Sequence, residues 1–220
     1  MYISNLKIKN YRTFKDFSID LKPLTLIIGE NNVGKSNLLD CIGLIFGQEV
    51  SYFKKRVLEV ADFNYSTVCD FKRRILNTSI NAEDIEYPEI SISVTLTDWD
   101  ADQESVIADW YLTEDFSIAG LTYIFAPNSR FDKIAHVENQ RAFIEKYKTE
   151  HSLEAYEKLS EIPKLDLINL PVSNYHYNIY GGVGNTTLAG GYHLNQLRFE
   201  LLNALRETNS YNTQQNTSNI

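Results

Sequence analysis

A lysine and a serine that directly follow a glycine are the residues of this chain best suited to chemistry. They end an eight-residue loop with the spacing G-x-x-x-x-G-K-[ST], which reads Gly29-Glu30-Asn31-Asn32-Val33-Gly34-Lys35-Ser36. In such a loop, backbone N–H groups converge at the start of a helix, where the helix dipole also favours negative charge. The pattern predicts a P-loop for the phosphates of a nucleoside triphosphate, and we expect ATP with Mg²⁺.

Each residue type in the loop suits one part of a triphosphate. Gly29 and Gly34 can take backbone angles closed to other residues, and neither places a Cβ between the main chain and a phosphate. Lys35 can deliver a positive charge to the β and γ phosphates, which makes it the candidate catalytic residue. The hydroxyl of Ser36 is the candidate ligand for the magnesium ion that bridges these phosphates.

The segments on either side of the loop match the context that a P-loop requires. Before it, the apolar run LTLII at 24–28 predicts a strand that is covered on both faces. After it, apolar residues recur at helical spacing up to Phe46, and Gly47 stands where a helix commonly ends. An ordinary glycine turn is the alternative, and this strand–loop–helix order argues against it.

The rest of the chain predicts an α/β fold. Period-two alternation predicts half-buried strands at 6–9, 17–21 and 90–96, and weaker patterns predict strands at 121–125, 167–172 and 175–180. Asp100, with Gln103 three residues later, predicts a capped helix through about Leu112. Further helices are expected at 143–159 and 194–206, short helices within 48–76, and a connecting loop at 77–88.

Composition and charge restrict the function classes. The 220 residues carry a net charge of −8, which argues against a surface that is basic all over and grips nucleic acid by charge alone. Two basic clusters, at 54–56 and 72–74, are interpreted as solvated faces, with DNA contact as the alternative. Cys41 and Cys69 are interpreted as buried thiols. Without an apolar run of membrane-spanning length or a secretory signal, the chain is expected to be cytoplasmic, with no membrane partner.

The first 46 residues also resemble a known family. The segment GENNVGKSN, after an opening of the form L-K-I-K-N-Y-R-T-F, is similar to the N-terminal ATPase lobe of RecF, SMC and OLD-type proteins. The resemblance implies a P-loop NTPase of the ABC/RecF/SMC type, with a mixed β-sheet, an antiparallel N-terminal subsheet and flanking helices. Residues 1–206 would form this part of the ATPase domain, and 207–220 a polar tail or the truncated start of an arm.

The resemblance extends the set of nucleotide-binding residues. It places Arg12 close to the nucleotide, Asn31, Asn32 and Val33 inside the phosphate loop, and Asn37 directly after the magnesium-binding serine. Arg12 has an alternative reading, in which it only covers the end of a strand. Asn32 stands where the family usually has a glycine or another small residue. The departure is mild, because Asn is the non-glycine residue that best tolerates a left-handed backbone.

Two parts that the family needs for hydrolysis are not found in the sequence. One is an apolar strand that ends in Asp-Glu, and the other is a signature segment donated across a dimer. Asp98 and Asp100 are interpreted as the end of a strand, and the glycine-rich run at 181–184 as a flexible turn. We therefore expect an N-terminal portion of a larger ATPase, with the remaining ATPase half and a Toprim nuclease domain elsewhere.

Three functional hypotheses remain open from the sequence. The first is an ATPase lobe that couples ATP binding and dimerisation to DNA binding or cleavage, in DNA repair or antiviral defence. The second is a regulatory or interaction module that binds ATP without hydrolysis, because the catalytic carboxylates are absent. The third is a small P-loop kinase, although kinases usually begin with the P-loop strand itself. A transporter ATPase is disfavoured, since its signature and Asp-Glu strand would normally fall within this length.

Overall fold

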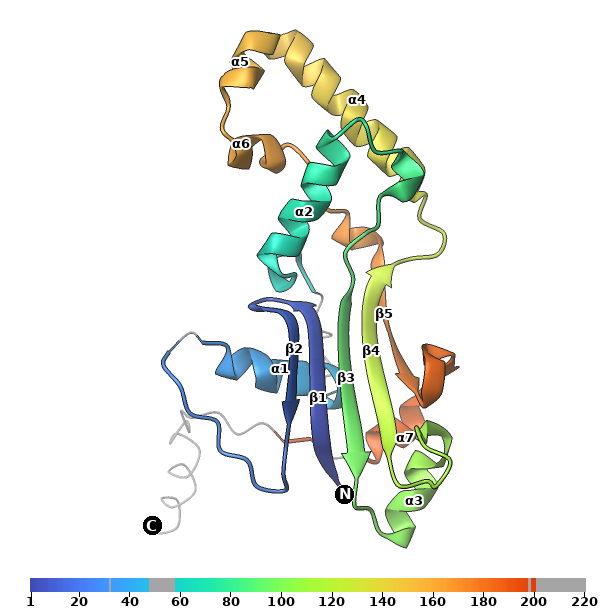
Figure 1. Cartoon of the computed structure of the whole chain (residues 1–220). Coiled ribbons are helices and arrows are strands. Elements are labelled where there is room, and N and C mark those ends of the chain that lie inside the picture. Colours follow the sequence, from blue (N-terminus) through green and yellow to red (C-terminus); the bar gives the residue numbers. More distant parts are fainter. Residues whose placement is uncertain (32, 48–57, 198, 201–220) are drawn as a thin grey trace, which may run out of the picture.

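A six-stranded antiparallel sheet forms the centre of the computed structural model, which describes residues 1–31, 33–47, 58–197 and 199–200. Its strand order is β2-β1-β3-β4-β5-β6, so β3 lies beside β1 although a long stretch of chain separates them (Figure 1). The strands are β1 (Tyr2–Tyr11), β2 (Phe14–Asp20), β3 (Ile90–Thr97), β4 (Ala119–Pro127), β5 (Tyr175–Gly181) and β6 (Thr187–Leu188).

The described part of the chain contains seven α-helices. They are α1 (Lys35–Phe46), α2 (Tyr65–Leu76), α3 (Ala101–Ile107), α4 (Lys133–His151), α5 (Leu153–Lys158), α6 (Glu161–Asp166) and α7 (Gly191–Asn195). Short 3-10 turns, η1 to η5, occur at Val60–Asp62, Ala82–Asp84, Ala108–Trp110, Val172–Asn174 and Val183–Asn185. The α/β class predicted from the sequence is confirmed. The described sheet, however, is antiparallel throughout rather than the mixed sheet that the resemblance implied, because every pair of neighbouring strands runs antiparallel. No helix among the described residues is long and apolar enough to cross a membrane.

The opening hairpin follows the alternation in its sequence. In β1, Leu6 and Ile8 are buried while Lys7 and Lys9 are exposed, as expected for a strand with one wet face. The strand β3 repeats the pattern and pairs with β1 so that Leu6 faces Val94. The predicted strands at 6–9, 17–21 and 90–96 are therefore confirmed.

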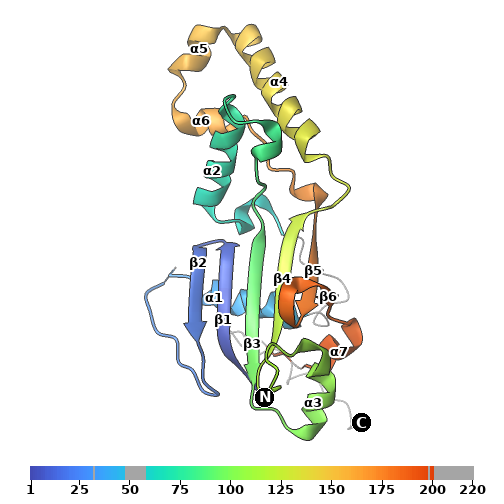
Figure 2. The same ribbon diagram turned by 45° about the vertical axis from the view of Figure 1, so that its right-hand side comes forward.

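The core lies between the sheet and α1. This helix crosses behind the sheet in both views and contacts β3 and β4 (Figures 1 and 2). The helix spans Lys35–Phe46 with Gly47 as its C-cap, where the sequence predicted its end. The buried side chains that meet here are Leu6, Ile8, Leu38, Cys41, Ile45, Ile92, Val94, Leu121 and Tyr123.

A helical subdomain made of α2 and α4 to α6 lies beyond the end of the sheet where β1 turns into β2 (Figure 1). The side chain of Arg141 on α4 donates to three backbone carbonyls at the end of α2, those of Ile75, Asn77 and Ile80. On α2, Arg73 pairs with Asp70 and with Glu161 of α6. The basic cluster at 72–74 thus binds its own subdomain in part, whereas the cluster at 54–56 lies outside the described residues.

The structure corrects the prediction of a buried strand at 24–28. This segment forms no strand, and its side chains are largely exposed, with Leu24 at 90%, Leu26 at 81% and Ile28 at 84%. The strand β2 is the edge strand of the sheet, and its one neighbour among the described strands is β1. No described strand pairs with the segment at 24–28. An apolar run suited to a covered strand is thus left uncovered.

Several other predicted boundaries are also wrong. Residues 167–172 form no strand, and the capped helix after Asp100 ends at Ile107 and continues as a 3-10 turn. The helix expected at 143–159 is two helices, because Ser152 has a positive φ and caps α5. The helix expected at 194–206 corresponds in its described part only to α7, and residues 201–206 lie outside the described chain. The capping box at Asp100 and the strands β4 and β5 are confirmed.

His136 on α4 predicts a pH dependence of folding. Its Nδ1 lies 2.7 Å from the Tyr87 hydroxyl, while its buried Nε2 has no hydrogen-bond partner in the described part of the chain. Burial lowers the pKa of His136 from 6.5, so the folded state holds its proton less well than the unfolded chain. Neutral His136 therefore contributes fully to the free energy of unfolding above pH 6.5. This contribution is lost as the pH falls through and below that value, because the folded state must then bury a charged imidazolium.

Urea unfolding at pH 7.5, 6.5 and 5.5 measures this effect. We expect His136→Phe to lose less unfolding free energy than the parent between pH 7.5 and 5.5. The Tyr87 hydroxyl keeps its bond to the Lys133 carbonyl, at 3.0 Å, in this variant. The control is His176→Phe at an exposed position. Equal pH slopes for His136→Phe and the parent would contradict the prediction.

Candidate functional site

The first turn of α1 is open to an anion. Gly34, at the N-cap, has a φ of 99°, and no side chain caps the helix. The first intrahelical bond runs from the Leu38 N–H to the Gly34 carbonyl, at 3.0 Å. The first turn contains no acidic residue. Its N–H groups and the positive end of the helix dipole are thus free of a competing negative side chain.

The ammonium of Lys35 lies across the mouth of the loop. Its Nζ donates to the carbonyl of Gly29, at 2.7 Å, and to that of Glu30, at 2.5 Å. These bonds hold the loop around the start of the helix. Because they are exposed bonds to neutral carbonyls, a phosphate can replace them with stronger, charge-assisted ones.

The β1–β2 turn packs against the glycine at the helix start. A Cβ added to Gly34 would lie 2.9 Å from the Thr13 hydroxyl and 3.1 Å from the Phe14 ring. The amide of Asn37 also donates to the Thr13 hydroxyl, at 3.2 Å. The turn and the loop therefore form one unit, in which both the positive φ and the close approach require glycine at position 34.

Arg12, in the same turn, bridges three segments of the chain. Its Nη1 donates to Asn37 Oδ1 at 2.8 Å and to Asp40 Oδ2 at 2.7 Å, both on α1. Its Nε donates to Asp62 Oδ1 at 2.9 Å. Burial alone would lower the pKa of Arg12, but the hydrogen bond to Asp62 and the nearby charges raise it above its ordinary value. The guanidinium thus lies beside the first turns of α1, held by two carboxylates.

The other predicted loop residues are exposed. Asn31, Val33 and Ser36 are exposed, while Asn32 lies outside the described residues. Gly29 has no positive φ, and an added Cβ would contact only the Val33 side chain, at 3.0 Å. The structure therefore brings Arg12 and Asn37 into contact beside Gly34 and Lys35, and leaves the Ser36 side chain open to solvent.

The two acidic residues after β3 are far from this loop. Thr97 pairs with Tyr2 at the start of β1, whereas Arg12 follows its end. A ten-residue strand is about 30 Å long, so Asp98 lies at the opposite end of the sheet from Arg12. Asp100 accepts a bond from the Gln103 N–H and caps α3. Both residues follow the end of β3, as the sequence suggested.

The glycine-rich run also lies at that far end. The Gly182 N–H donates to the Gly120 carbonyl, and β4 pairs there with the end of β3. Gly182 and Gly184 have positive φ values, as expected in a turn. A Cβ on Gly181 would lie 1.9 Å from the buried Trp110, so this glycine allows a close approach. The run is a packed turn rather than a second phosphate loop.

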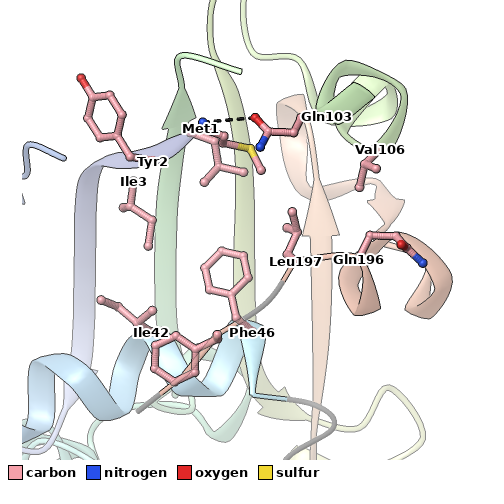
Figure 3. Close-up of a pocket in the computed structure, with 11 residues that line it drawn as sticks. Met1, Tyr2, Ile3, Ile42, Phe46, Gln103, Val106, Gln196 and Leu197 are labelled. Atoms are coloured by element: carbon pink, nitrogen blue, oxygen red, sulfur yellow. Dashed lines mark hydrogen bonds between the residues drawn. The ribbon is translucent and has the colours of Figure 1, made fainter. Parts of the chain in front are cut away.

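An apolar pocket of about 430 Å³ lies along the C-terminal half of α1 (Figure 3). Its wall includes Ile3, Ile42, Phe46 and Leu197, and the amino terminus donates to Gln103 Oε1 at 3.1 Å at its rim. None of the described loop residues between 29 and 36 lines it. The pocket is therefore separate from the nucleotide loop.

Comparison with protein families decides the class of the domain. The family model described as "AAA ATPase domain" matches residues 1–220, the whole chain. The chain belongs to the AAA ATPase domain family. The family match supports nucleotide binding by this chain, and the loop before α1 carries the P-loop sequence pattern.

Curated relatives of this AAA ATPase domain match it over short stretches. The DNA replication and repair protein RecF of Corynebacterium jeikeium is 37% identical over 46 residues, 20% of this chain and 11% of that protein. The OLD nuclease of Thermus scotoductus is 40% identical over 45 residues, 20% of the chain and 8% of the nuclease. An ATP/GTP phosphatase of Helicobacter pylori is 39% identical over 61 residues, 27% of the chain and 16% of the phosphatase.

These matches support the predicted resemblance to RecF and OLD-type proteins. The aligned stretches span no more than 16% of the length of these three relatives. The match is therefore to a small part of each protein.

The structure adds three residues to the site of the AAA ATPase domain that the sequence did not assign. Thr13, Asp40 and Asp62 contact Asn37 or Arg12. The sequence of the segment Ala61-Asp62-Phe63-Asn64 contains no local pattern that assigns a role to Asp62. Asp62 is 50 residues from Arg12 in the sequence, and only folding brings the two side chains into contact.

Proposed function

We propose that this chain is the ATP-binding lobe of an ABC-type ATPase similar to RecF, SMC and OLD-type proteins. The observation that carries the proposal is the uncapped start of α1, where the N–H groups and the Lys35 ammonium converge at a loop of P-loop sequence. In this role, Gly29 to Asn37 enclose the phosphates, and Arg12 stands beside them.

The residues of the loop also suit magnesium bound with the nucleotide. Magnesium prefers oxygen ligands and usually keeps several waters, so one protein hydroxyl together with phosphate oxygens is a fitting set. Ser36, exposed in the first turn of α1, would supply that hydroxyl. The nearby carboxylates of Asp40 and Asp62 bind Arg12. The ion would neutralise charge on the β and γ phosphate oxygens.

The uncovered segment at 24–28 supports the proposal that the lobe is one part of a larger ATPase. Four large apolar residues within five positions, with only Thr25 between them, are typical of a strand in the middle of a parallel sheet, with neighbours on both faces. Three of these side chains are more than 80% exposed, directly before the phosphate loop. Further strands placed here would cover them and bring new residues to the nucleotide.

A role with DNA follows from the family resemblance. RecF is named for DNA replication and repair, and the OLD protein is named as a nuclease. We propose that ATP binding drives dimerisation or assembly with the remaining ATPase and Toprim nuclease parts, and that the assembly controls DNA binding or cleavage in repair or antiviral defence. With a net charge of −8, the chain relies on that assembly rather than on its own surface charge for DNA contact.

Binding without turnover is the expected behaviour of the isolated chain. We expect saturable equilibrium binding of a non-hydrolysable ATP analogue in magnesium buffer. We expect no phosphate release from ATP, with or without DNA, because the sequence offers no Asp-Glu strand to activate water. Failure to bind the analogue would contradict the proposal. Transfer of phosphate to a small acceptor would instead favour a kinase.

A regulatory ATP-binding module is the second candidate function. The distance between the acidic residues after β3 and the P-loop favours it, because the described chain then places no strand-end carboxylate at the nucleotide. The two candidates differ when the remaining ATPase parts are supplied. Turnover in the mixture supports the lobe, and unchanged binding without turnover supports the module.

A further inference from the structure

Two polar residues are buried beside the β1–β2 turn, Asp62 at 8% exposure and Asn64 at 9%. Burial of a carboxylate is costly unless partners satisfy its charge. One oxygen of Asp62 accepts from Arg12 Nε at 2.9 Å, and the other accepts from the Glu59 N–H at 3.1 Å. The carboxylate is thus fixed at both oxygens, one of which is committed to Arg12.

The backbone around these residues fixes the same turn. The Arg12 N–H donates to the Asp62 carbonyl at 2.8 Å, and the Asn64 amide donates to the Arg12 carbonyl at 2.9 Å. The φ of Arg12 is 48°, a conformation that few residues other than glycine adopt without support. Both backbone groups and the side chain of Arg12 are therefore held by the segment at 62–64.

The far side of the guanidinium contacts the helix that starts at the phosphate loop. Asn37 accepts from Arg12 at 2.8 Å, and Asp40 accepts at 2.7 Å from the same Nη1. The next residue of the turn, Thr13, accepts from Asn37 and lies against Gly34. A continuous set of contacts thus runs from Asp62 through Arg12 to the first turn of α1.

We propose that Asp62 is a positioning residue for the phosphate loop. By holding the Arg12 guanidinium, it keeps the β1–β2 turn and the first turn of α1 in the arrangement that receives the phosphates. Its effect on the loop would run through the contact with Arg12. The effect on nucleotide affinity rests on the proposed nucleotide-binding function, whereas the effect on the loop does not.

The test compares Asp62→Asn with Asp70→Asn in the full chain. Asp70 is a matched control, because it pairs with Arg73 and Lys15 but its side chain is 54% exposed. An asparagine at 62 keeps the size of the side chain but removes the charge that binds Arg12. We expect Asp62→Asn to weaken binding of the non-hydrolysable ATP analogue by about tenfold, as for the loss of one charge-assisted hydrogen bond, and Asp70→Asn to change it by less than about twofold.

A double-mutant cycle separates positioning from a general loss of structure. In an Arg12→Gln background, Asp62→Asn should have no further effect on analogue affinity, because its partner is already gone. An equal loss in both backgrounds would overturn the proposal, since Asp62 would then act independently of Arg12. An affinity unchanged by Asp62→Asn in the parent background would overturn it as well.

Amide hydrogen exchange without nucleotide gives a second readout. We expect Asp62→Asn to speed exchange of the Leu38 amide, which donates to the Gly34 carbonyl, by about tenfold and Asp70→Asn to leave it unchanged. If the parent chain binds no analogue, the proposed function fails, and this exchange result still decides the role of Asp62. If Asp62→Asn does not fold, Arg12→Lys takes its place, because lysine keeps the charge but not the bridge. Unchanged loop exchange in Arg12→Lys would then overturn the proposal.

Discussion

Replacing Lys35 by alanine is expected to weaken binding of an ATP analogue by about a hundredfold or more. The ammonium is placed across the loop by bonds to the Gly29 and Glu30 carbonyls, where a β or γ phosphate would take its donors. Charge-assisted bonds of this kind contribute about 1.5 to 3 kcal/mol each, and 1.4 kcal/mol is a factor of ten in affinity. Equilibrium titration of a fluorescent, non-hydrolysable analogue in magnesium buffer measures the loss.

The control for this experiment is Lys7→Ala. Lys7 is an exposed lysine on β1, so its removal changes the net charge by the same amount without touching the loop. We expect its affinity to stay within about twofold of the parent, since exposed charges at a distance are screened by salt. Equal affinities for Lys35→Ala and the parent chain would contradict the assignment of residues 29–36 as the phosphate-binding loop.

Replacing Gly34 by alanine is expected to reduce the free energy of unfolding by about 2 to 5 kcal/mol. The left-handed backbone at a φ of 99° costs a non-glycine residue about 1 to 2 kcal/mol. The new methyl group would also meet the Thr13 hydroxyl at 2.9 Å and the Phe14 ring at 3.1 Å, and overpacking of this kind costs about 1 to 3 kcal/mol. Urea unfolding monitored by circular dichroism measures the change.

Gly29→Ala is the matched control for Gly34→Ala. Gly29 belongs to the same loop, but its φ is not positive, and the added methyl group would contact only the exposed side chain of Val33. Since that side chain can move away, we expect a cost below about 1 kcal/mol. Similar losses for the two variants would show that the β1–β2 turn does not press on the start of α1.

Local sequence patterns predicted the elements that carry their own signal. The alternation around Lys7 and in β3 predicted strands, because a half-buried strand repeats every two residues. The capping box at Asp100 predicted the start of α3, since its bonds span only three residues. The end of that helix was wrong, because helix length depends on packing as well as on caps.

The segment at 24–28 shows where local patterns fail. Its four apolar residues and one threonine have the composition of a covered strand, yet strand formation needs a neighbour that supplies hydrogen bonds. Among the described residues, β2 pairs only with β1, and no other strand reaches the segment. The sequence indicated what the segment is suited to, and the described structure does not supply its partner.

The sequence by itself determined the phosphate loop, its glycines and the helix that follows, because all of these lie within about twenty neighbouring residues. Only the tertiary structure decided that Arg12 is held by Asp40 and Asp62, residues 28 and 50 positions further along the chain. The physical reason is that a P-loop is built from backbone groups and a helix dipole, which are local properties. An ion-pair cluster depends instead on how distant segments pack, and the spacing of residues in the sequence does not reveal which distant segments come into contact.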